Sequence, residues 1–338
     1  GVVAASSPRD IGAELARDHD LILVAEWPLE ALQQRGLEFL AVPDKVHERL
    51  AALAADPRLE DIQLPRTHHV SGMPASAAAE RPIEDPYFDL QMRTQRRWVE
   101  PILRRGGGRG VRMAIIDTGV DTQHPDLVGQ ITEASNFVGG DPAMVPAEFH
   151  GTAVTGLVAA RPGNGIGIHG LAPEAEIFAL RACWEPTYAY GLCSTKTLAQ
   201  ALDYAIEIRA RIINLSLAGP DDRVLSRLVD RAIELGGVVF GAVGDDPGQT
   251  FPASIPGVIA VRQTIVEGPQ MDGAVLSVAG LQMLSTVPDG RYDFVSGPSF
   301  ATAHASGVAA VMLDIEPHLR APDLVDWLQR AHHNAATP

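Results

Sequence analysis

From residue 112 onward, short apolar runs alternate with stretches in which apolar residues recur every three or four positions. Short runs are typical of buried strands, and the three-to-four spacing is typical of helices. This alternation predicts an α/β fold with a doubly wound, mostly parallel sheet that helices cover on both faces. The expected strands are 113–116, 177–180, 212–217, 238–243 and 258–261. The helical stripes are Leu198, Ala201, Leu202, Ala205 and Ile206, and Leu225, Leu228, Val229, Ala232 and Ile233.

The first part of the chain predicts a small separate unit. Its strands are expected at 21–26, 37–42 and 59–64, and its helices at 28–35 and 44–55. This order predicts a small α+β domain of ferredoxin-like type, residues 1–66, with its helices on one side of the sheet. Residues 67–84 are rich in Ser, Ala, Pro and His near their start and lack an apolar period, so they are predicted to be a linker. Residues 85–338 form the larger domain.

Composition narrows the classes of function. The 338 residues are 46% hydrophobic and 20% charged, as in folded globular proteins. The formal net charge of −15 argues against a nucleic-acid binder and against a protein held on anionic lipid. No apolar run approaches the roughly 18 residues needed to span a bilayer. The opening GVVAASS lacks a basic start and a full apolar stretch, so it is not an intact signal peptide.

The two cysteines, Cys183 and Cys193, flank a short segment that contains Pro186 and Gly191. Such a segment can turn back on itself, so a local disulfide is expected, and it would imply an oxidising compartment. Two reduced structural thiols are the alternative, because sequence does not supply the Cα spacing that decides between them.

Three residues stand where a parallel sheet would carry a catalytic site. Asp117 follows a buried strand, which is where side chains reach a cleft. His150 opens a helix of small residues, a position that suits a general base. Ser299 lies between Pro298 and a helix rich in Ala and Gly, whose first N–H groups can stabilise an oxyanion. Each residue taken singly also has an ordinary structural interpretation.

Taken together, these segments resemble a known family. IIDTGVDTQHPDL, HGTAVTGLVAA and SGPSFATAHASGVAA resemble the three active-site signatures of subtilases, in the chain order Asp, His, Ser. INLSLAGP resembles the substrate-binding strand of these enzymes, and FPASIPGVIAV a segment that follows their oxyanion region. The resemblance covers residues 85 to the C-terminus.

The resemblance implies a subtilisin-like serine endopeptidase that needs no cofactor for its chemistry. Asp117, His150 and Ser299 would form the triad, and Ser299 would form an acyl-enzyme with a protein or peptide substrate. The N-terminal unit would be a propeptide that inhibits its own peptidase domain, and the protein would act outside the cytoplasm. The implied substrate-binding residues are Ser216, Leu217, Ala218, Ala242 and Gly244.

The sequence departs from the family at the oxyanion position. Subtilases usually place an Asn there, and the matching residue here is Asp245, with the Ser299 N–H as the second donor. An ionised carboxylate only accepts hydrogen bonds, whereas a protonated one donates, so activity is expected to be slow or shifted toward acid. The alternatives are that Ser299 N–H acts alone, that the protein is a weak or inactive pseudoprotease binding a partner in the same cleft, or that an uncleaved N-terminal domain keeps it silent.

Further substitutions lie beside the nucleophile or in its binding strand. Pro298, Phe300 and Ala303 replace residues usual in the family next to the serine, and Ala218 replaces a Gly that borders the primary specificity pocket. Each is tolerable separately, and their accumulation favours a specialised or inactive relative.

ARPGNGIGIHG resembles the loop that binds calcium in many subtilases. Asn164 and the carbonyls of Ile166 and Ile168 would supply oxygen ligands, and Asp126 the carboxylate. An ordinary Gly-rich turn is the alternative, and the cation of Arg161 beside the loop favours it. His124, in a turn before Pro125, is expected to be structural, and His304 is expected to make a buried hydrogen bond. No spacing indicates zinc.

Overall fold

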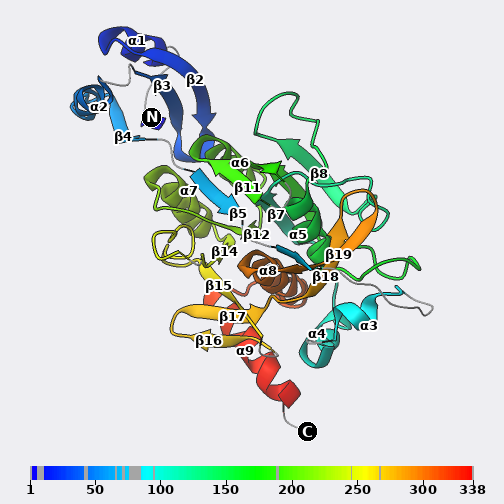
Figure 1. Ribbon diagram of the computed structural model, residues 1–338. Helices are drawn as coiled ribbons and strands as arrows, with labels where there is room; N and C mark the ends of the chain where they lie inside the picture. The colour runs from blue at the N-terminus through cyan, green and yellow to red at the C-terminus, as the bar shows by residue number, and fades with distance from the viewer. Residues whose placement is uncertain are drawn as a thin grey trace.

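The computed structural model describes residues 2–5, 11–41, 45–64, 67–70, 73–75, 85–93, 96–187, 190–244, 246–265 and 268–336. An eight-stranded sheet forms the centre of the larger part of the chain (Figure 1). Its pairings are parallel except where the edge strand β16 meets β17. In spatial order the strands are β16 (Gln270–Asp272), β17 (Val275–Ala279), β15 (Ile259–Thr264), β14 (Val238–Ala242), β12 (Ile212–Leu215), β7 (Arg112–Asp117), β9 (Glu176–Arg181) and β8 (Ile131–Asn136).

The predicted doubly wound sheet is therefore confirmed, with one break. The run 212–217 ends as a sheet strand at Leu215, and after Ser216 the chain leaves the sheet as β13 (Leu217–Ala218). β8 was not expected because its sequence, ITEASN, has no apolar run.

Helices cover both faces of this sheet, as the alternating side chains of its strands require. Met113 of β7 belongs to the core shared with α5 (Phe149–Ala159) and α8 (Pro298–Ile315). Ala114 belongs to the core shared with α6 (Thr195–Glu207) and α7 (Arg223–Glu234). The other helices described in this larger part of the chain are α3 (Phe88–Gln91), α4 (Arg96–Leu103) and α9 (Ala321–Ala336). None of the described helices is long and apolar enough to cross a membrane.

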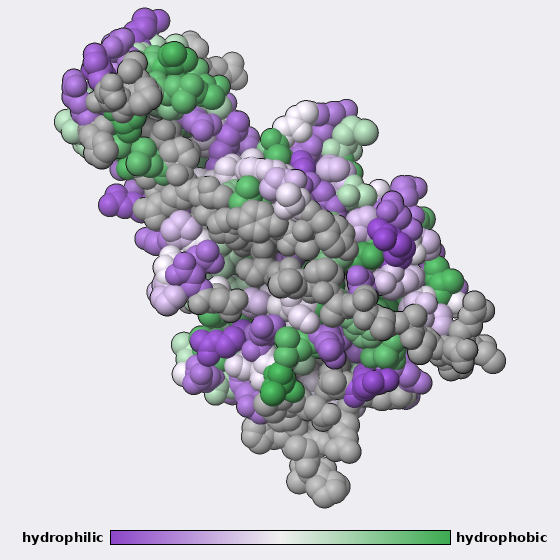
Figure 2. Space-filling model, viewed as in Figure 1, coloured by the Kyte–Doolittle hydropathy of each residue, from purple (hydrophilic) through white to green (hydrophobic). Residues whose placement is uncertain are grey.

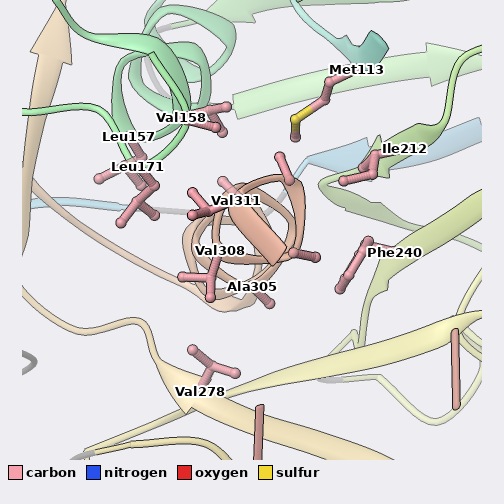
Figure 3. Close-up of a cluster of buried hydrophobic side chains, with 14 of the residues drawn as sticks. Met113, Leu157, Val158, Leu171, Ile212, Phe240, Val278, Ala305, Val308 and Val311 are labelled. Atoms are coloured by element: carbon pink, nitrogen blue, oxygen red, sulfur yellow. The ribbon is translucent and has the colours of Figure 1, made fainter. Parts of the chain in front are cut away.

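Helix α8 is buried on all sides, which explains its small residues. Figure 3 shows it seen along its axis, with Val308 and Val311 on the side of Leu157 and with Phe240 of β14 on the opposite side. Close packing of this kind leaves no room for larger side chains. Shortening one of the buried side chains lowers the free energy of unfolding by about 1 kcal/mol per methylene removed. The helix is consequently a rigid support for the residues at its start.

The N-terminal unit has the ferredoxin-like order β2-β3-β1-β4, with antiparallel pairings throughout and two helices. Its elements are β1 (Val2–Ala5), α1 (Ile11–Asp18), β2 (Ile22–Leu29), β3 (Gln34–Leu40), α2 (Val46–Ala54) and β4 (Leu59–Gln63). The helix expected at 28–35 is wrong. That range holds the end of β2, a single 3-10 turn, η1 (Glu30–Leu32), and the start of β3, and Gln33 closes the turn at φ +54°.

The unit has a small core of its own, made by four buried side chains: Ile11, Leu15, Leu37 and Phe39. Figure 2 shows hydrophobic residues gathered on its surface at the upper left, and the exposed apolar residues include Ile22 and Leu40. Trp27 and Leu29 are instead buried in the core of the larger part, against α6 and α7. A unit this small is only marginally stable by itself and gains stability from that contact.

Two short strands lie in the range predicted to be a linker. β5 (Thr67–Val70) lies between β11 (Tyr190–Ser194) and β13, in a sheet of order β10-β11-β5-β13 that also contains β10 (Cys183–Thr187). β6 (Met73–Ala75) pairs with β19 (Arg291–Ser296), which pairs with β18 (Met283–Val287). The described part of this range thus runs along the larger domain, and the domain boundaries themselves stay predictions.

Candidate active site

Asp117 and His150 meet where β7 ends and α5 begins. Asp117 is the last residue of β7, and its Oδ1 lies 2.7 Å from Nδ1 of His150. The same oxygen accepts from the N–H of Thr118, and both side chains are 1–2% exposed. Because a carboxylate only accepts, Nδ1 donates, so the proton is fixed on that nitrogen.

Close backbone approach makes this pairing possible. A Cβ on Gly151 would lie 2.5 Å from the carbonyl oxygens of Thr118 and Gly119. The Gly151 N–H donates to Thr118 Oγ1 at 2.8 Å, which ties the first turn of α5 to the loop after β7. Sterics therefore explain why DTG and HGT contain glycine. Any side chain at residue 151 would push the start of α5 away from the end of β7.

Ser299 is the second residue of α8 and is fully buried. Its Oγ donates to the carbonyl of Ser216 at 2.7 Å, and Ser216 Oγ donates back to the carbonyl of Ser299 at 2.8 Å. The His150 ring lies 5.2 Å, centre to centre, from the ring of Phe300, the residue that follows the serine. The structure thus brings the Asp117–His150 pair and Ser299 into one region, at the starts of two helices packed against each other.

A buried chain of polar side chains holds the backbone of Ser299. Asn214 Nδ2 donates to Ser216 Oγ at 2.8 Å, and Ser306 Oγ, about two helical turns beyond Ser299, donates to Asn214 Oδ1 at 3.0 Å. All of these atoms are satisfied, so the network rigidifies the site without a desolvation penalty. Asn214 and Ser306 lie inside the segments INLSLAGP and SGPSFATAHASGVAA, but neither was assigned a role from the sequence. The polar Asn214 inside the apolar run IINL was a usable signal.

The predicted substrate-binding residues lie beside the nucleophile. β13 carries Leu217 and Ala218 and has an antiparallel partner in β5, with Leu217 opposite Val70. Gly244 approaches Ala218 so closely that a Cβ on the glycine would lie 2.9 Å from that of Ala218. Ala242 ends β14 next to this contact and is buried. Asp245 lies outside the described residues.

Comparison with known proteins decides the family. A model of the Subtilase family matches residues 108–337, more than half of the chain. The chain belongs to the subtilase family. It is 34% identical to Thermitase of Thermoactinomyces vulgaris over 238 residues, which are 68% of this chain and 84% of that protein. It is 36% identical to Thermophilic serine proteinase of Bacillus sp. (strain AK1) over 61% of this chain and 53% of that protein, so it spans about half the length of that relative.

An intracellular protein and a solved structure are also similar to this subtilase. Major intracellular serine protease of Bacillus subtilis (strain 168) is 33% identical over 62% of this chain and 70% of that protein. The crystal structure of fervidolysin from Fervidobacterium pennivorans, described as a keratinolytic enzyme related to subtilisin, superposes with a TM-score of 0.71 at 20% identity. It covers 95% of this chain and 55% of fervidolysin, and it supports the fold alone.

Charged residues that no family signature indicates surround the start of α5 in this subtilase. Glu185 of β10 accepts the N–H of His150 at 2.7 Å and the N–H of Phe149 at 2.9 Å. Glu148 accepts from Arg181 Nη2 at 2.7 Å and from Arg181 Nε at 2.8 Å, and also from the N–H of Gly119. Burial raises the pKa of Glu185, while the two helix N–H donors act in the opposite direction.

The predicted disulfide is confirmed. Cys183 and Cys193 are bonded across the β10–β11 pair, where they lie opposite each other with a Cα–Cα distance of 4.2 Å. Cys183 also begins the strand that carries Glu185, and Cys193 belongs to the strand beside β5. The crosslink therefore fixes a hairpin that contacts both the start of α5 and the strand β5.

Two of the residues proposed as calcium ligands with Asp126, namely Asn164 and Ile168, contact its carboxylate, both through N–H groups. Asp126 is buried and accepts from Asn164 Nδ2 at 2.8 Å, from the Ile168 N–H at 2.9 Å and from Tyr292 OH at 2.9 Å. Ile166 lies in the same loop, where its N–H donates to Asn164 Oδ1 at 3.0 Å. Burial raises the pKa of Asp126.

Asp85 approaches the same loop and was not predicted. It is 4% exposed, its Oδ2 accepts from the N–H of Gly163, and its Oδ1 has no hydrogen-bond partner among the described residues.

His124 and His304, the two other histidines considered in the sequence analysis, differ in their hydrogen bonding. His124 donates through Nε2 to the carbonyl of Arg291 at 2.9 Å and accepts at Nδ1 from the Asp126 N–H, so it is structural, as expected. His304 was expected to make a buried hydrogen bond, and that is wrong within the described residues: neither ring nitrogen has a partner. Its ring packs instead on Trp98 at 5.2 Å, and complete burial lowers the pKa of His304 to about 3.

Proposed function

We propose that this subtilase is a serine endopeptidase in which Asp117, His150 and Ser299 form the catalytic triad. The 2.7 Å contact between Asp117 and Nδ1 of His150, at the start of a helix packed beside that of Ser299, supports this most directly. With Nδ1 bonded to Asp117, Nε2 takes the hydroxyl proton as Ser299 attacks the peptide carbonyl. The protonated His150 then returns the proton to the leaving amine, and water hydrolyses the acyl-enzyme.

The substrate backbone would bind as an added strand. β13 and β11 already have a strand of this chain, β5, between them, which supports extended peptide binding at that place. Ser216, Leu217 and Ala218 would pair with the acyl side of the substrate, and Ala218, Ala242 and Gly244 would line its primary pocket. The oxyanion would be bound by the Ser299 N–H and by residue 245.

Labelling with a fluorophosphonate probe at mildly acidic and mildly alkaline pH tests this function. An activated serine gives labelling that disappears in a Ser299→Ala variant. No labelling at either pH, in folded protein freed of the residues before Asp85, would favour the pseudoprotease, for which the acidic residue at 245 is the observation in its favour.

The N-terminal unit is proposed to be the intramolecular inhibitor of this protease. Both oxygens of Asp203 on α6 accept from the first N–H groups of η1, Glu30 at 2.7 Å and Ala31 at 2.6 Å. Arg227 of α7 donates to Asp61 at 2.8 Å, and the ammonium of Lys196 lies 5.6 Å from the centre of the Trp27 ring. These contacts, with β5 in the cleft, support a unit that binds its own peptidase domain as a substrate would.

Asp203→Ala is expected to weaken this inhibition at least tenfold. The variant leaves two N–H groups of η1 without their charged acceptor, and a hydrogen bond to a charged group contributes about 1.5–3 kcal/mol. The measurement is the rate at which fluorophosphonate labels Ser299 in the self-processed protein, with gel filtration to follow release of the N-terminal fragment. Asp326→Ala, an exposed site on α9, is the matched control. Equal labelling rates in the two variants would contradict the proposal.

A structural calcium ion is proposed for the loop that follows α5. Oxygen donors fit it: Asp85 and Asp126 are both buried, no cationic side chain among the described residues neutralises either one, and Asp85 Oδ1 lacks a partner. Asn164 and the carbonyls of Ile166 and Ile168 would complete the set, as carboxylates and carbonyls do for calcium. The ion would hold the loop and supply no step of the reaction.

Removing calcium is expected to lower Tm by about 5 °C, the effect of a ligand present at about 100 times its Kd. The measurement is thermal unfolding in calcium and in excess chelator. Asp85→Asn should abolish the difference, whereas Asp272→Asn, exposed and far from the loop in sequence, should preserve it. A Tm that is the same with and without chelator in the unmodified protein would remove the site.

The disulfide supports the proposal that the protein acts outside the cytoplasm. The Cys183–Cys193 disulfide is the type of crosslink that persists in oxidising compartments. The similar intracellular protein of Bacillus subtilis makes this a point for experiment. Thiol alkylation of protein taken directly from its source cells would leave both cysteines unmodified if the disulfide exists there.

A further inference from the structure

Glu185 closes the N-terminus of the helix that carries His150. The helix has no acidic residue in its first turn, and the side chain of its N-cap residue, Glu148, makes no capping bond. Its first two N–H groups, which have no partner within the helix, are bound by the two oxygens of Glu185 at 2.9 and 2.7 Å. A carboxylate in this position is favoured both by the two donors and by the helix dipole.

The charged groups around Glu185 indicate that its carboxylate interacts with the start of the His150 helix and not with a cationic side chain. The other acid at this place, Glu148, is neutralised by Arg181, which also donates to Asn136. The Glu185 side chain makes no ion pair among the described residues, and its electrostatic partners are His150, which favours its charged form, and Glu148, which opposes it. His150 thus faces two carboxylates, Asp117 on its ring and Glu185 at its backbone.

Glu185 is held in this position by a crosslinked hairpin. It lies two residues after Cys183 on β10, and its own N–H donates to Glu148 at 3.2 Å. The partner strand, β11, pairs on its other side with β5, the strand that occupies the proposed place of the substrate. The backbone of the catalytic histidine is therefore tied, through one carboxylate, to the same hairpin that borders the bound peptide.

We infer that Glu185 is a positioning residue for His150: its carboxylate fixes the backbone from which the imidazole extends and stabilises the imidazolium formed when Ser299 loses its proton. The inference rests on the proposed triad. It has two separable parts, because the bidentate contact needs the length of a glutamate, whereas the electrostatic part needs only its charge.

Three variants separate these parts. Glu185→Gln keeps the shape and loses the charge, Glu185→Asp keeps the charge and loses the reach, and Glu174→Gln removes an equal charge from the exposed pair with Arg109. The rate of fluorophosphonate labelling of the self-processed protein is measured against pH, together with kcat and KM for a peptide substrate. Unfolding curves show how far each variant is destabilised.

In Glu185→Gln the pH of half-maximal labelling on the acid side, which reports protonation of His150, should fall by roughly half a unit. The reason is that the imidazolium has lost a nearby negative charge. kcat should fall about tenfold with little change in KM, since the contact concerns the base and not the substrate. Glu185→Asp should keep the midpoint of the unmodified protein while its rate falls, and Glu174→Gln should change neither.

A midpoint in Glu185→Gln equal to that of the unmodified protein, with only a lower Tm, would reduce Glu185 to a helix cap and overturn the inference. If the Gln variant does not fold, an Asp variant with undiminished rate does the same. Absence of labelling in the unmodified protein would instead refute the proposed triad, so the two failures are distinguishable.

Discussion

Replacing Ser299 with alanine is expected to lower kcat for peptide hydrolysis by about 10⁶-fold, the magnitude measured for the corresponding change in subtilisin. The reason is that only the hydroxyl of Ser299 stands at the start of α8, beside the Asp117–His150 pair, and no other described side chain there can replace it as nucleophile. The measurement is hydrolysis of a peptide substrate by purified protein. Ser277→Ala, a change on the edge-side strand β17, is the control and should retain full activity.

The same variant should also remain uncut. β5 ends at Val70 beside β13 and β6 begins at Met73 beside β19. If the protein processes itself as proposed, the bond that it cleaves is expected between these two residues. N-terminal sequencing of the mature protein should then begin at residue 71, 72 or 73. A Ser299→Ala chain that still matures at this place, in the absence of any added protease, would contradict self-processing.

The sequence predicts the rigid parts of this molecule well, for physical reasons. Apolar runs such as 238–243 become buried parallel strands because a sheet covered on both faces tolerates few polar side chains. Asp117 and His150 could be found because Gly119 and Gly151 beside them are required for close approach, and Ser299 because Gly297 before it takes a φ of +152°. Those requirements leave motifs. The cysteine pair was recognisable because the hairpin between its members is short.

Contacts between segments far apart in the sequence were beyond such reasoning. Glu185 lies 35 residues from His150 and in no motif, so no sequence pattern indicated that β10 would bring it to the start of α5. The strands β5 and β6 have no hydrophobic alternation, and their backbones instead pair with strands of the larger domain: β5 with β11 and β13, and β6 with β19. The helix expected at 28–35 fails for the same reason: Trp27 and Leu29 are apolar to fit α6 and α7, not a helical face.

Asp245→Asn is expected to raise kcat/KM at neutral pH by about 10²-fold, the factor by which loss of the corresponding amide donor slows subtilisin. Gly244 lies close to Ala218, and residue 245 follows it in the sequence. Residue 245 is therefore at the sequence position of the family's oxyanion donor. An ionised aspartate repels the oxyanion, and only its protonated form can donate. In the unmodified protein activity should therefore fall as pH rises through the titration of Asp245, and fall again at low pH when His150 becomes protonated.

The pH profile distinguishes this explanation from its rival. An amide does not titrate, so Asp245→Asn should lose the fall on the alkaline side and keep the fall on the acid side, which belongs to His150. Asp246→Asn is the matched control: it removes the same charge one residue later, where the carboxylate accepts the N–H of Gly248 at 2.9 Å, and should leave the profile unchanged. If Asp245→Asn brings no gain at neutral pH, then the Ser299 N–H carries the oxyanion without residue 245, and the slow, acid-shifted enzyme expected here is replaced by an ordinary one with a single strong donor.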